Sequence, residues 1–251
     1  MRPGGICIVA ALFASVGSAD VCAPAGLQGA YGFQLTGTTT IGSQLQPVVT
    51  VGRLVFDGEG GVTGVSSVSF TGLYLGNPVS GKYEQRTDCS VSWSLQDDSG
   101  NFQHFEGTMR PDGRRIQFRQ TDPGGASGGT LLKSSDTCQE QDFRPRYRFR
   151  LTGRQINVDT AQPAGSVSAE GIIENRGGQL TLTLSGETAS PGAGTAEVDG
   201  DCFVRLHLIV PFEAGRTLDA NFRGILVDRS SELLGMATDP GTALSLRLTA
   251  P

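Results

Sequence analysis

The chain is built from one module that occurs twice. Residues 31–37 read YGFQLTG and residues 147–153 read YRFRLTG, and in each copy a cysteine stands nine residues before the tyrosine. Three further motifs recur at offsets of 113 to 117 residues: Asp88-Cys89 as Asp201-Cys202, Phe105-Glu106-Gly107 as Phe222-Arg223-Gly224, and residues 121–124 (TDPG) as residues 238–241. A repeat of about 115 residues has the size of an ordinary domain and far exceeds a solenoid unit. The sequence therefore predicts two tandem modules.

Both modules have the sequence pattern of β-strands. Large apolar residues alternate with small or polar ones, 36 glycines and 12 prolines mark frequent turns, and we find no amphipathic helical run after residue 20. We predict an all-β fold with eight strands in each module. The first eight lie near 30–36, 47–57, 61–70, 81–86, 89–96, 101–109, 114–121 and 127–133. The second eight lie near 145–153, 165–174, 178–185, 194–199, 202–210, 219–227, 232–238 and 243–249.

The repeated fifth strand indicates how each module closes. Its alternate positions stay apolar in both copies, whereas Ser92 and Ser94 between them become Arg205 and His207. Eight antiparallel strands with one apolar face each close most simply into an up-and-down barrel, which leaves no exposed edge. A β-sandwich is the alternative. Bulky inward residues favour a filled first module, and smaller ones favour the second as the module with a cavity.

The first 19 residues have the pattern of a secretory signal peptide. Arg2 precedes an apolar run over residues 6–16, and small residues at 17–19 precede Asp20. The run is too short to span a membrane, and no later stretch approaches 18 apolar residues. We therefore expect an exported protein, periplasmic or extracellular, without a transmembrane segment. Its modules would cover residues 20–134 and 135–251.

Four cysteines remain after removal of such a signal peptide. Each module has one before its first strand and one after an aspartate, so the simplest pairing joins Cys22 to Cys89 and Cys138 to Cys202. Each bond would close a loop of about 65 residues and stabilise the fold by roughly 4 kcal/mol in the chain-entropy model. Free reactive thiols are the alternative, but the CxxC spacing typical of them is absent.

The order of motifs in the first module resembles that of small secreted bacterial proteins of uncharacterised families. The shared features are Cys22, residues 29–33 (GAYGF), residues 52–60 (GRLVFDGEG) and residues 81–89 (GKYEQRTDC). The resemblance implies an eight-stranded barrel of calycin type or similar to allene oxide cyclase. The second module departs from the pattern, with Glu174-Asn175 in place of Phe56-Asp57 and Ala196 in place of Tyr83. These are turn and core residues, so the resemblance concerns the fold and carries over no catalytic residue.

Few groups in the sequence are suited to catalysis or metal binding. A nucleophile elbow, an HExxH motif and a P-loop are absent, and only two histidines occur. His104 and Glu106 share a strand face, where two solvated polar residues are the simpler interpretation. Residues 57–61 (DGEGG) indicate a hairpin turn rather than a calcium loop. We predict no metal and no cofactor. Without Arg2, 19 basic residues stand against 25 acidic ones, which argues against nucleic-acid binding.

A basic run begins the second module. It consists of Arg144, Arg146, Arg148 and Arg150. These arginines alternate with the apolar residues of the repeated strand, so they lie on its opposite face. The first module has Ala30, Gly32 and Gln34 at three of the matching positions. One interpretation of this arginine stripe is a binding surface for an acidic glycan or lipid headgroup. The alternatives are a solvated outer face or a seam with acidic residues of the first module.

These features favour an exported, non-enzymatic protein with a structural or binding role, for a small apolar or anionic ligand. The alternative is an enzyme of the cyclase or isomerase type, in which a barrel cavity orients a small apolar substrate. A cell-surface interaction module is a third class, marked by an exposed apolar or arginine-rich patch. The interior of the barrels distinguishes these classes, because binding or isomerisation requires an open cavity with a few polar groups.

Overall fold

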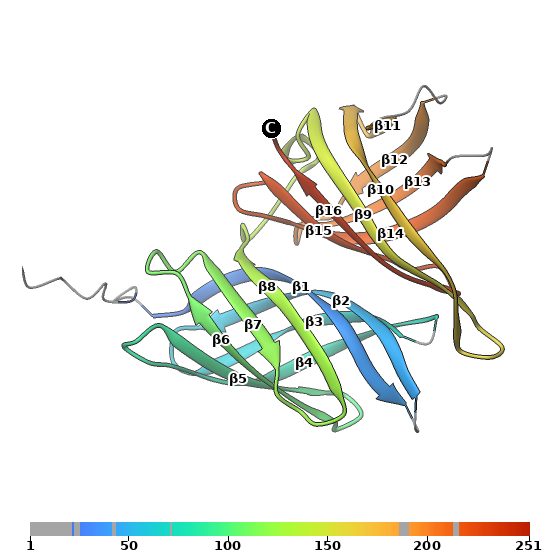
Figure 1. The fold of residues 1–251 in the computed structure, drawn as a ribbon. Coiled ribbons are helices and arrows are strands. Elements are labelled where there is room, and N and C mark those ends of the chain that lie inside the picture. The colour runs from blue at the N-terminus through green and yellow to red at the C-terminus, as the bar shows by residue number, and fades with distance from the viewer. Residues whose placement is uncertain (1–21, 23–25, 42–43, 71, 186–190, 213–215) are drawn as a thin grey trace, which may run out of the picture.

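The computed structural model describes residues 22, 26–41, 44–70, 72–185, 191–212 and 216–251 (Figure 1). The predicted signal peptide lies outside these residues. The described chain is all-β, as predicted, with one short 3-10 helix at Glu140–Asp142. The first eight strands are β1 (Gln28–Ile41), β2 (Gln44–Asp57), β3 (Gly61–Phe70), β4 (Leu73–Gln85), β5 (Ser90–Asp97), β6 (Phe102–Met109), β7 (Arg115–Gln120) and β8 (Gly125–Lys133). The second eight are β9 (Arg146–Asn157), β10 (Gln162–Arg176), β11 (Gln179–Leu184), β12 (Gly192–Val198), β13 (Phe203–Pro211), β14 (Thr217–Val227), β15 (Glu232–Ala237) and β16 (Thr242–Thr249).

The strands form two closed antiparallel rings. Each strand pairs with the next one in the sequence, and each ring closes by pairing its first strand with its last, β1 with β8 and β9 with β16. The prediction of two tandem eight-stranded barrels is therefore confirmed, and the sandwich alternative is wrong. The two barrels lie side by side in Figure 1.

All sixteen predicted strands are present, and the main difference concerns β4. This strand begins at Leu73, eight residues before its predicted start at residue 81. Gly76 and Pro78 interrupt the sequence pattern there, because glycine weakens a strand signal and proline lacks a ladder donor. The structure nevertheless pairs Pro78 with Val65 of β3. The first hairpin is also longer than predicted, since β1 continues to Ile41 and β2 starts at Gln44.

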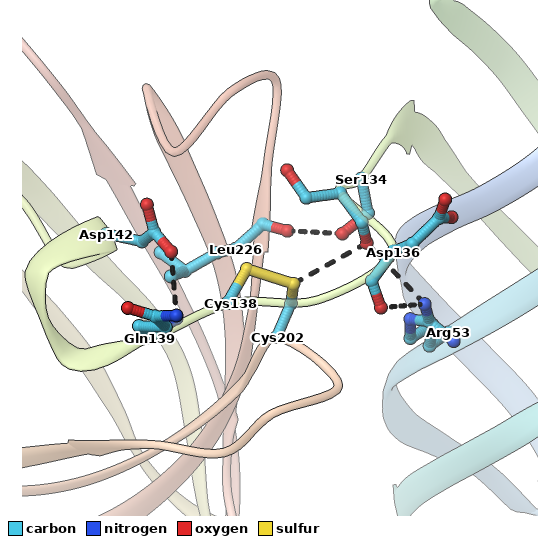
Figure 2. Close-up of a disulfide and its surroundings, with 9 residues drawn as sticks. Arg53, Ser134, Asp136, Cys138, Gln139, Asp142, Cys202 and Leu226 are labelled. Atoms are coloured by element: carbon cyan, nitrogen blue, oxygen red, sulfur yellow. Dashed lines mark hydrogen bonds between the residues drawn. A yellow bond between two sulfur atoms is a disulfide. The ribbon is translucent and has the colours of Figure 1, made fainter.

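One disulfide fastens the entry of each barrel to the turn before its fifth strand. Cys22 is bonded to Cys89 and Cys138 to Cys202, with Cα–Cα distances of 5.2 and 4.8 Å. The predicted pairing is confirmed. Cys138 lies in the connection between the barrels, and Figure 2 shows how that connection is held. Ser134 Oγ donates to Leu226 O at 2.8 Å, and Arg53 Nη2 donates to Asp136 O at 2.9 Å. The connection is therefore packed against both barrels.

The repeated tyrosine is hydrogen-bonded to the hairpin turn between the sixth and seventh strands of its own barrel. Tyr31 Oη donates to Gly113 O at 2.8 Å, and Tyr147 Oη donates to Ser230 O at 2.9 Å. Both rings are buried, with exposed fractions of 3% and 0%. A buried phenol requires a partner for its hydroxyl, and the turn carbonyl supplies it in each copy. This bond explains why the tyrosine occurs in both modules.

The barrels contact each other through the outer faces of a few strands. Strand β15 is buried along its whole length, because one face lines its own barrel and the other meets the first barrel. Val49, Val51 and Leu132 of the first barrel belong to the same buried apolar cluster as the core of the second. Gln34 Nε2 donates to Gly235 O at 2.7 Å across this contact. The apolar core is thus continuous between the barrels.

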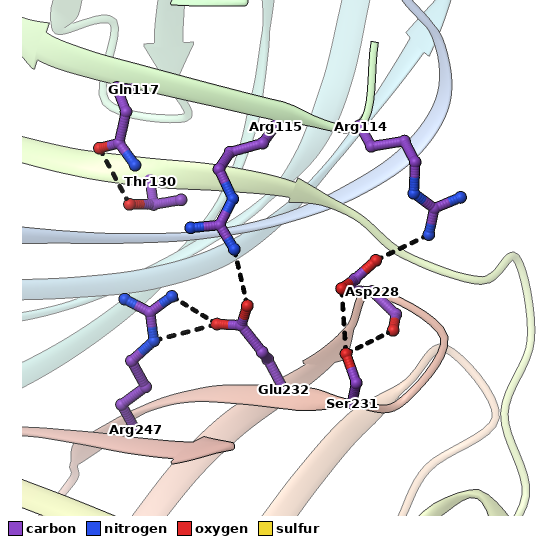
Figure 3. A network of polar contacts seen from close by, with 8 residues as sticks. All are labelled: Arg114, Arg115, Gln117, Thr130, Asp228, Ser231, Glu232 and Arg247. Atoms are coloured by element: carbon purple, nitrogen blue, oxygen red, sulfur yellow. Dashed lines mark hydrogen bonds and ion pairs between the residues drawn. The ribbon is translucent and has the colours of Figure 1, made fainter. Parts of the chain in front are cut away.

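An ionic network borders this apolar contact (Figure 3). The carboxylate of Glu232 lies between two guanidinium groups: Arg115 Nη2 is 2.7 Å from Oε1, and Arg247 Nε is 3.0 Å from Oε2. The Glu232 side chain is only 9% exposed. A second pair joins Arg114 Nη2 to Asp228 Oδ1 at 2.8 Å. The buried charge of Glu232 is therefore balanced by one arginine from each barrel.

Candidate ligand-binding site

A cavity of about 590 Å³ occupies one half of the first barrel. Its wall is mostly apolar, and strands β1 to β6 supply nearly all of it. The apolar lining residues are Phe33, Leu35, Val48, Val68, Phe70, Leu75, Val79, Leu95 and Phe105. Leu75 is 45% exposed, so the cavity opens to solvent at the end where β3 meets β4. Ligand pockets typically measure about 300–1,000 Å³ and have this apolar lining.

Polar side chains surround the mouth of the cavity. They are Thr39, Asn77, Asp97, Asp98, Ser99, Asn101, Gln103 and Gln120. Asp97 Oδ1 accepts hydrogen bonds from Ser99 Oγ at 2.6 Å, Ser99 N at 3.0 Å and Asn101 N at 3.0 Å. The bond from the Ser99 hydroxyl is the main cause that lowers the pKa of Asp97 below its ordinary value. The mouth therefore presents an ionised carboxylate in a fixed turn.

The other half of the first barrel is filled by aromatic rings. Trp93 stacks on Phe105, with centroids 5.3 Å apart and planes inclined by 18°. Phe118 meets Trp93 edge to face at 5.1 Å. The expectation that bulky residues fill the first barrel is therefore correct for one half only. Alternation along a strand shows which face a residue lies on, whereas its level along the barrel axis depends on register and strand tilt.

The second barrel carries apolar residues where the first has its polar mouth. Gln103 pairs with Leu95, and Ala220 pairs with the matching Leu208 of the second barrel. Gln120 pairs with Phe105, and Ala237 pairs with the matching Phe222. Gln103 therefore corresponds to Ala220, and Gln120 to Ala237. By the same register Asp97 and Asn101 correspond to Val210 and Leu218. All four residues of the second barrel are buried. The expectation that the second module holds the cavity is therefore not met by this pocket, which lies in the first.

The sequence analysis missed these cavity residues, although a signal was present. Inward positions of the first module carry polar residues at Thr50, Ser66, Asn77 and Gln103. Each of them interrupts an otherwise apolar strand face. A packed core seldom tolerates polar groups without partners. Four such interruptions on the inward faces of one barrel therefore indicate an opening.

The two histidines belong to surface contacts and lie away from this cavity. His104 Nδ1 is 2.7 Å from Asp122 Oδ1, while Glu106 pairs with Arg119 at 3.3 Å, so the suggested His104–Glu106 pair does not form. Asp122 belongs to the repeated TDPG turn. In the second barrel the equivalent Asp239 receives a bond from Asn221 Nδ2 at 2.8 Å. Because asparagine replaces histidine in the copy, the contact fastens a turn and needs no imidazole chemistry.

The arginine stripe lies on the outer face of β9, and its arginines are exposed. Strand register places Arg146 opposite Glu174 and Arg150 opposite Glu170 on β10. Arg144 precedes the strand and donates to Arg229 O at 2.9 Å. The acidic neighbours come from the second barrel itself, so the suggested seam with the first barrel is wrong. Anion binding by the stripe stays a prediction.

Two further sequence interpretations concern metals and membranes. Asp57 Oδ1 accepts from Glu59 N at 2.7 Å and Gly61 N at 2.9 Å, which makes residues 57–61 a hairpin turn. The backbone bond from Glu59 is the main cause that lowers the pKa of Asp57.

Within the described residues, no three histidine, cysteine or acidic side chains gather as metal ligands would. None of the helices described there has the length and apolar character needed to cross a membrane.

Comparisons with known proteins give structural neighbours at low similarity only. No protein-family model matches the chain, and no curated protein matches its sequence. The structure is similar to isotype 1 transferrin binding protein B from serogroup B Neisseria meningitidis, at 8% identity and a TM-score of 0.34, over 90% of this chain and 75% of that one. It is also similar to the Myxococcus xanthus hemagglutinin, solved with a mannopentaose, at 13% identity and a TM-score of 0.16, over 88% and 99% of the two chains. The Burkholderia oklahomensis agglutinin matches at 10% identity and a TM-score of 0.17, over 87% and 94%. Similarity at this level carries no argument about function, and the calycin-type resemblance stays a prediction.

Proposed function

We propose that the protein is an exported, non-enzymatic binding protein that takes up a small, largely apolar ligand in its first barrel. The observation that carries this proposal is the open cavity of about 590 Å³ with an apolar wall and a polar mouth. An apolar wall favours burial of apolar ligand surface, and a few polar groups at one end orient the ligand. The second barrel then has a supporting role, since its buried β15 packs against the first.

The alternative of a cyclase or isomerase requires a group that gives or takes a proton beside the substrate. Among the described residues, two titratable side chains line the cavity, Asp97 and Asp98, and both lie at its mouth. Asp97 is held ionised by its turn, which makes it a poor proton donor at neutral pH. The apolar depth of the cavity contains no such group among its lining residues. This distribution favours binding over proton-transfer chemistry.

Export of the protein is supported by two disulfides and by the signal-like residues 1–19. Disulfides form and persist in oxidising compartments, which include the periplasm and the exterior of the cell. Within this proposal the chain is a tandem relative of the calycin-type or allene-oxide-cyclase-like barrels that its first module resembles. An eight-stranded barrel of that type has an interior that holds one small ligand.

The proposal is tested by filling the cavity from one strand. Val68 faces the cavity from β3, whereas Val65 on the same strand faces outward and is 37% exposed. We expect Val68→Phe to lower the affinity for the neutral apolar dye N-phenyl-1-naphthylamine roughly tenfold or more, the effect of overfilling a packed site. Val65→Phe is the matched control and should bind as the wild type does. Dye fluorescence measures both affinities.

Trp93 supplies an independent readout. It is the only tryptophan in the chain, and it stacks on Phe105, whose side chain lines the cavity. A ligand in the cavity should therefore change the Trp93 emission in the wild type and in Val65→Phe. Dye binding that is equal in Val68→Phe and the wild type, or that leaves the Trp93 emission unchanged, would contradict a site in the first barrel.

A further inference from the structure

We infer that the ligand of the first barrel is a cationic amphiphile, with an apolar tail in the cavity and a positively charged amine-type head at its mouth. This inference rests on the proposed function and names the class of ligand. It depends on the distribution of charge around the opening. The cavity is lined by two carboxylates, Asp97 and Asp98, and no lysine, arginine or histidine of the described chain is among its lining residues.

The connections around the mouth have the same character. At this end, residues 98–101 and 121–124 join successive strands, and they read DSGN and TDPG. They contain Asp98 and Asp122 and no basic residue. At the opposite end, the connections of the same barrel carry three basic and three acidic residues: Arg86, Arg110 and Arg114 with Glu59, Asp88 and Asp112. The connections at the filled end are therefore balanced in charge, whereas those at the open end carry acidic groups without basic ones.

Asp97 has the geometry to receive a cationic head. It follows Leu95 on the inward face of β5, so its carboxylate stands at the level just beyond the apolar wall. Its three turn bonds all go to Oδ1. Within the described part of the chain, Oδ2 receives no hydrogen bond and can accept one from an ammonium group. Hydrogen bonds between ionised partners are about twice as strong as neutral ones.

The other polar groups at the mouth are consistent with this ligand. Asn77 and Gln103 present neutral amides to the opening, and Gln103 is exposed. A carboxylate or sulfate head would approach two like charges and find no cation to compensate its lost hydration. Asp122 is engaged by His104 and Gln120, at 2.7 and 3.1 Å. The mouth therefore selects against anionic amphiphiles such as fatty acids.

The test compares three probes that share a dodecyl chain: dodecylammonium, dodecanol and dodecanoate. Each is titrated at neutral pH, below the concentration at which it forms micelles, and Trp93 emission reports binding. We expect dodecylammonium to bind at least about tenfold more tightly than dodecanoate, with dodecanol between them. The reason is that the carboxylates of Asp97 and Asp98 attract the ammonium head and repel the carboxylate head. Added salt should narrow the difference, because exposed charges are screened.

Two substitutions connect this selectivity to the mouth. Asp98→Asn and Asp97→Asn should each weaken dodecylammonium binding roughly threefold to fivefold, the effect of one exposed ion pair. Asp201→Asn removes the same charge from an exposed position on the second barrel and is the matched control. Asp98 accepts no hydrogen bond from the described residues, so its variant keeps the turn intact if Asp97→Asn disturbs it.

The outcomes separate the two proposals. Failure of the neutral dye to bind would overturn the proposed function and this inference together. Dye binding combined with dodecanoate or dodecanol affinity equal to or above that of dodecylammonium would overturn the inference alone. An equal loss of dodecylammonium affinity in Asp201→Asn and Asp98→Asn would also overturn it, because only the net charge would then matter.

Discussion

The two barrels share their framework and differ in two of their surfaces. Each has eight strands in the same order, one disulfide at its entry and one tyrosine bonded to the turn between its sixth and seventh strands. The TDPG turn is also held alike in both, by His104 in the first barrel and Asn221 in the second. These shared contacts close and fasten a barrel. They account for most of the residues that recur in the sequence.

The first difference lies on the outer face of the first strand. In the first barrel, β1 carries Ala30, Gly32 and Gln34 there and meets the second barrel. In the second barrel, β9 carries the arginine stripe there and faces solvent. The contact is therefore not symmetric: β1 and β2 of one barrel meet β14 to β16 of the other. One copy of the strand became an interface and the other a charged surface.

The second difference lies at the ends of the barrels. The first barrel has a polar mouth at Asp97, Asn101 and Gln103, whereas the equivalent residues of the second are apolar and buried. Polar residues at an inward position destabilise a packed core unless they are bonded or solvated. Their presence in one copy alone indicates a division of labour, in which the first barrel binds and the second supports it.

The largest expected effect comes from exchanging the outer-face residues of β1 and β9. A Cβ at Gly32 would lie 2.5 Å from Val227 Cγ1 and 2.8 Å from Ile225 Cγ1. Gly32→Arg places the residue of the second barrel at this contact, where a large charged side chain has no space. We expect a loss of more than about 3 kcal/mol in the free energy of unfolding, measured in urea.

The reciprocal change is the control for this substitution. Arg148 occupies the matching position on the exposed face of β9. Arg148→Ala should alter the free energy of unfolding by no more than about 0.5 kcal/mol, as surface substitutions usually do. If Gly32→Arg were as stable as the wild type, the close contact between β1 and β14 would be incorrect. Separation of the barrels should also increase the radius of gyration in Gly32→Arg.

A smaller effect is expected from the ionic network at the same contact. Glu232→Gln removes a nearly buried carboxylate that balances Arg115 and Arg247, and leaves two guanidinium groups without their counter-ion. We expect a loss of about 1–3 kcal/mol in the free energy of unfolding. Glu106→Gln removes the carboxylate of an exposed pair with Arg119 and should cost less than about 1 kcal/mol. Equal losses in both variants would mean that burial of Glu232 has no consequence.

The repeated tyrosine permits a comparison of its two bonding environments. Tyr147 Oη donates to Ser230 O and also accepts from Arg144 N at 3.1 Å, whereas Tyr31 Oη only donates, to Gly113 O. Tyr147→Phe leaves one buried and one partly buried backbone group without its partner and should cost about 1–2 kcal/mol, against about 0.5–1.5 kcal/mol for Tyr31→Phe. Denaturant unfolding of the two variants measures this order. The reverse order would mean that the bond to Arg144 N contributes nothing.

The same tyrosines give the protein a dependence on alkaline pH. Burial raises the pKa of Tyr31 to about 12, from an ordinary value of 10.0. The unfolded chain therefore loses the phenol proton at lower pH than the folded one. The contribution of Tyr31 to stability is complete below pH 10 and is lost as the pH rises through 12. Between these values Tyr31→Phe should lose less stability than the wild type, in unfolding measured at stepped pH.

The repeat made the strands and the disulfides predictable from the sequence. The position of the cavity was not predictable, because it depends on how the strands are aligned in the closed barrel. Alternation and offsets were enough for sixteen strands and for the pairing of Cys22 with Cys89, because each copy constrained the interpretation of the other. The position of the cavity depended on which inward residues share one level of the barrel. Phe33 and Phe105 reach the filled half as well as the cavity, and no short motif records this.

The contacts between the barrels could not be predicted from the alternation of apolar and polar residues either. The glycine at position 32 looks like an ordinary small strand residue, and only its closeness to Ile225 and Val227 shows why it is small. The alternation along β9 likewise shows that its arginines share one face, but not whether that face packs or meets solvent. Their difference from β1 reflects where the second barrel packs, which depends on the surface of β14 to β16 rather than on either strand alone.

The smallest expected effect concerns His104, one of the two histidines considered as catalytic groups in the sequence. His104→Asn gives the first barrel the residue that the second already uses beside its TDPG turn. An amide at this position can bond Asp122 as Asn221 bonds Asp239, so the free energy of unfolding should change by less than about 0.5 kcal/mol. Ligand binding in the cavity should be unchanged, since His104 is not among the lining residues. Asp122→Ala is the contrast, because it also removes the acceptor of His104 N at 2.7 Å and should cost about 1–3 kcal/mol. A loss of ligand binding in His104→Asn with unchanged stability would show that the imidazole has a role that asparagine cannot fill. It would also support a catalytic role at this edge of the first barrel.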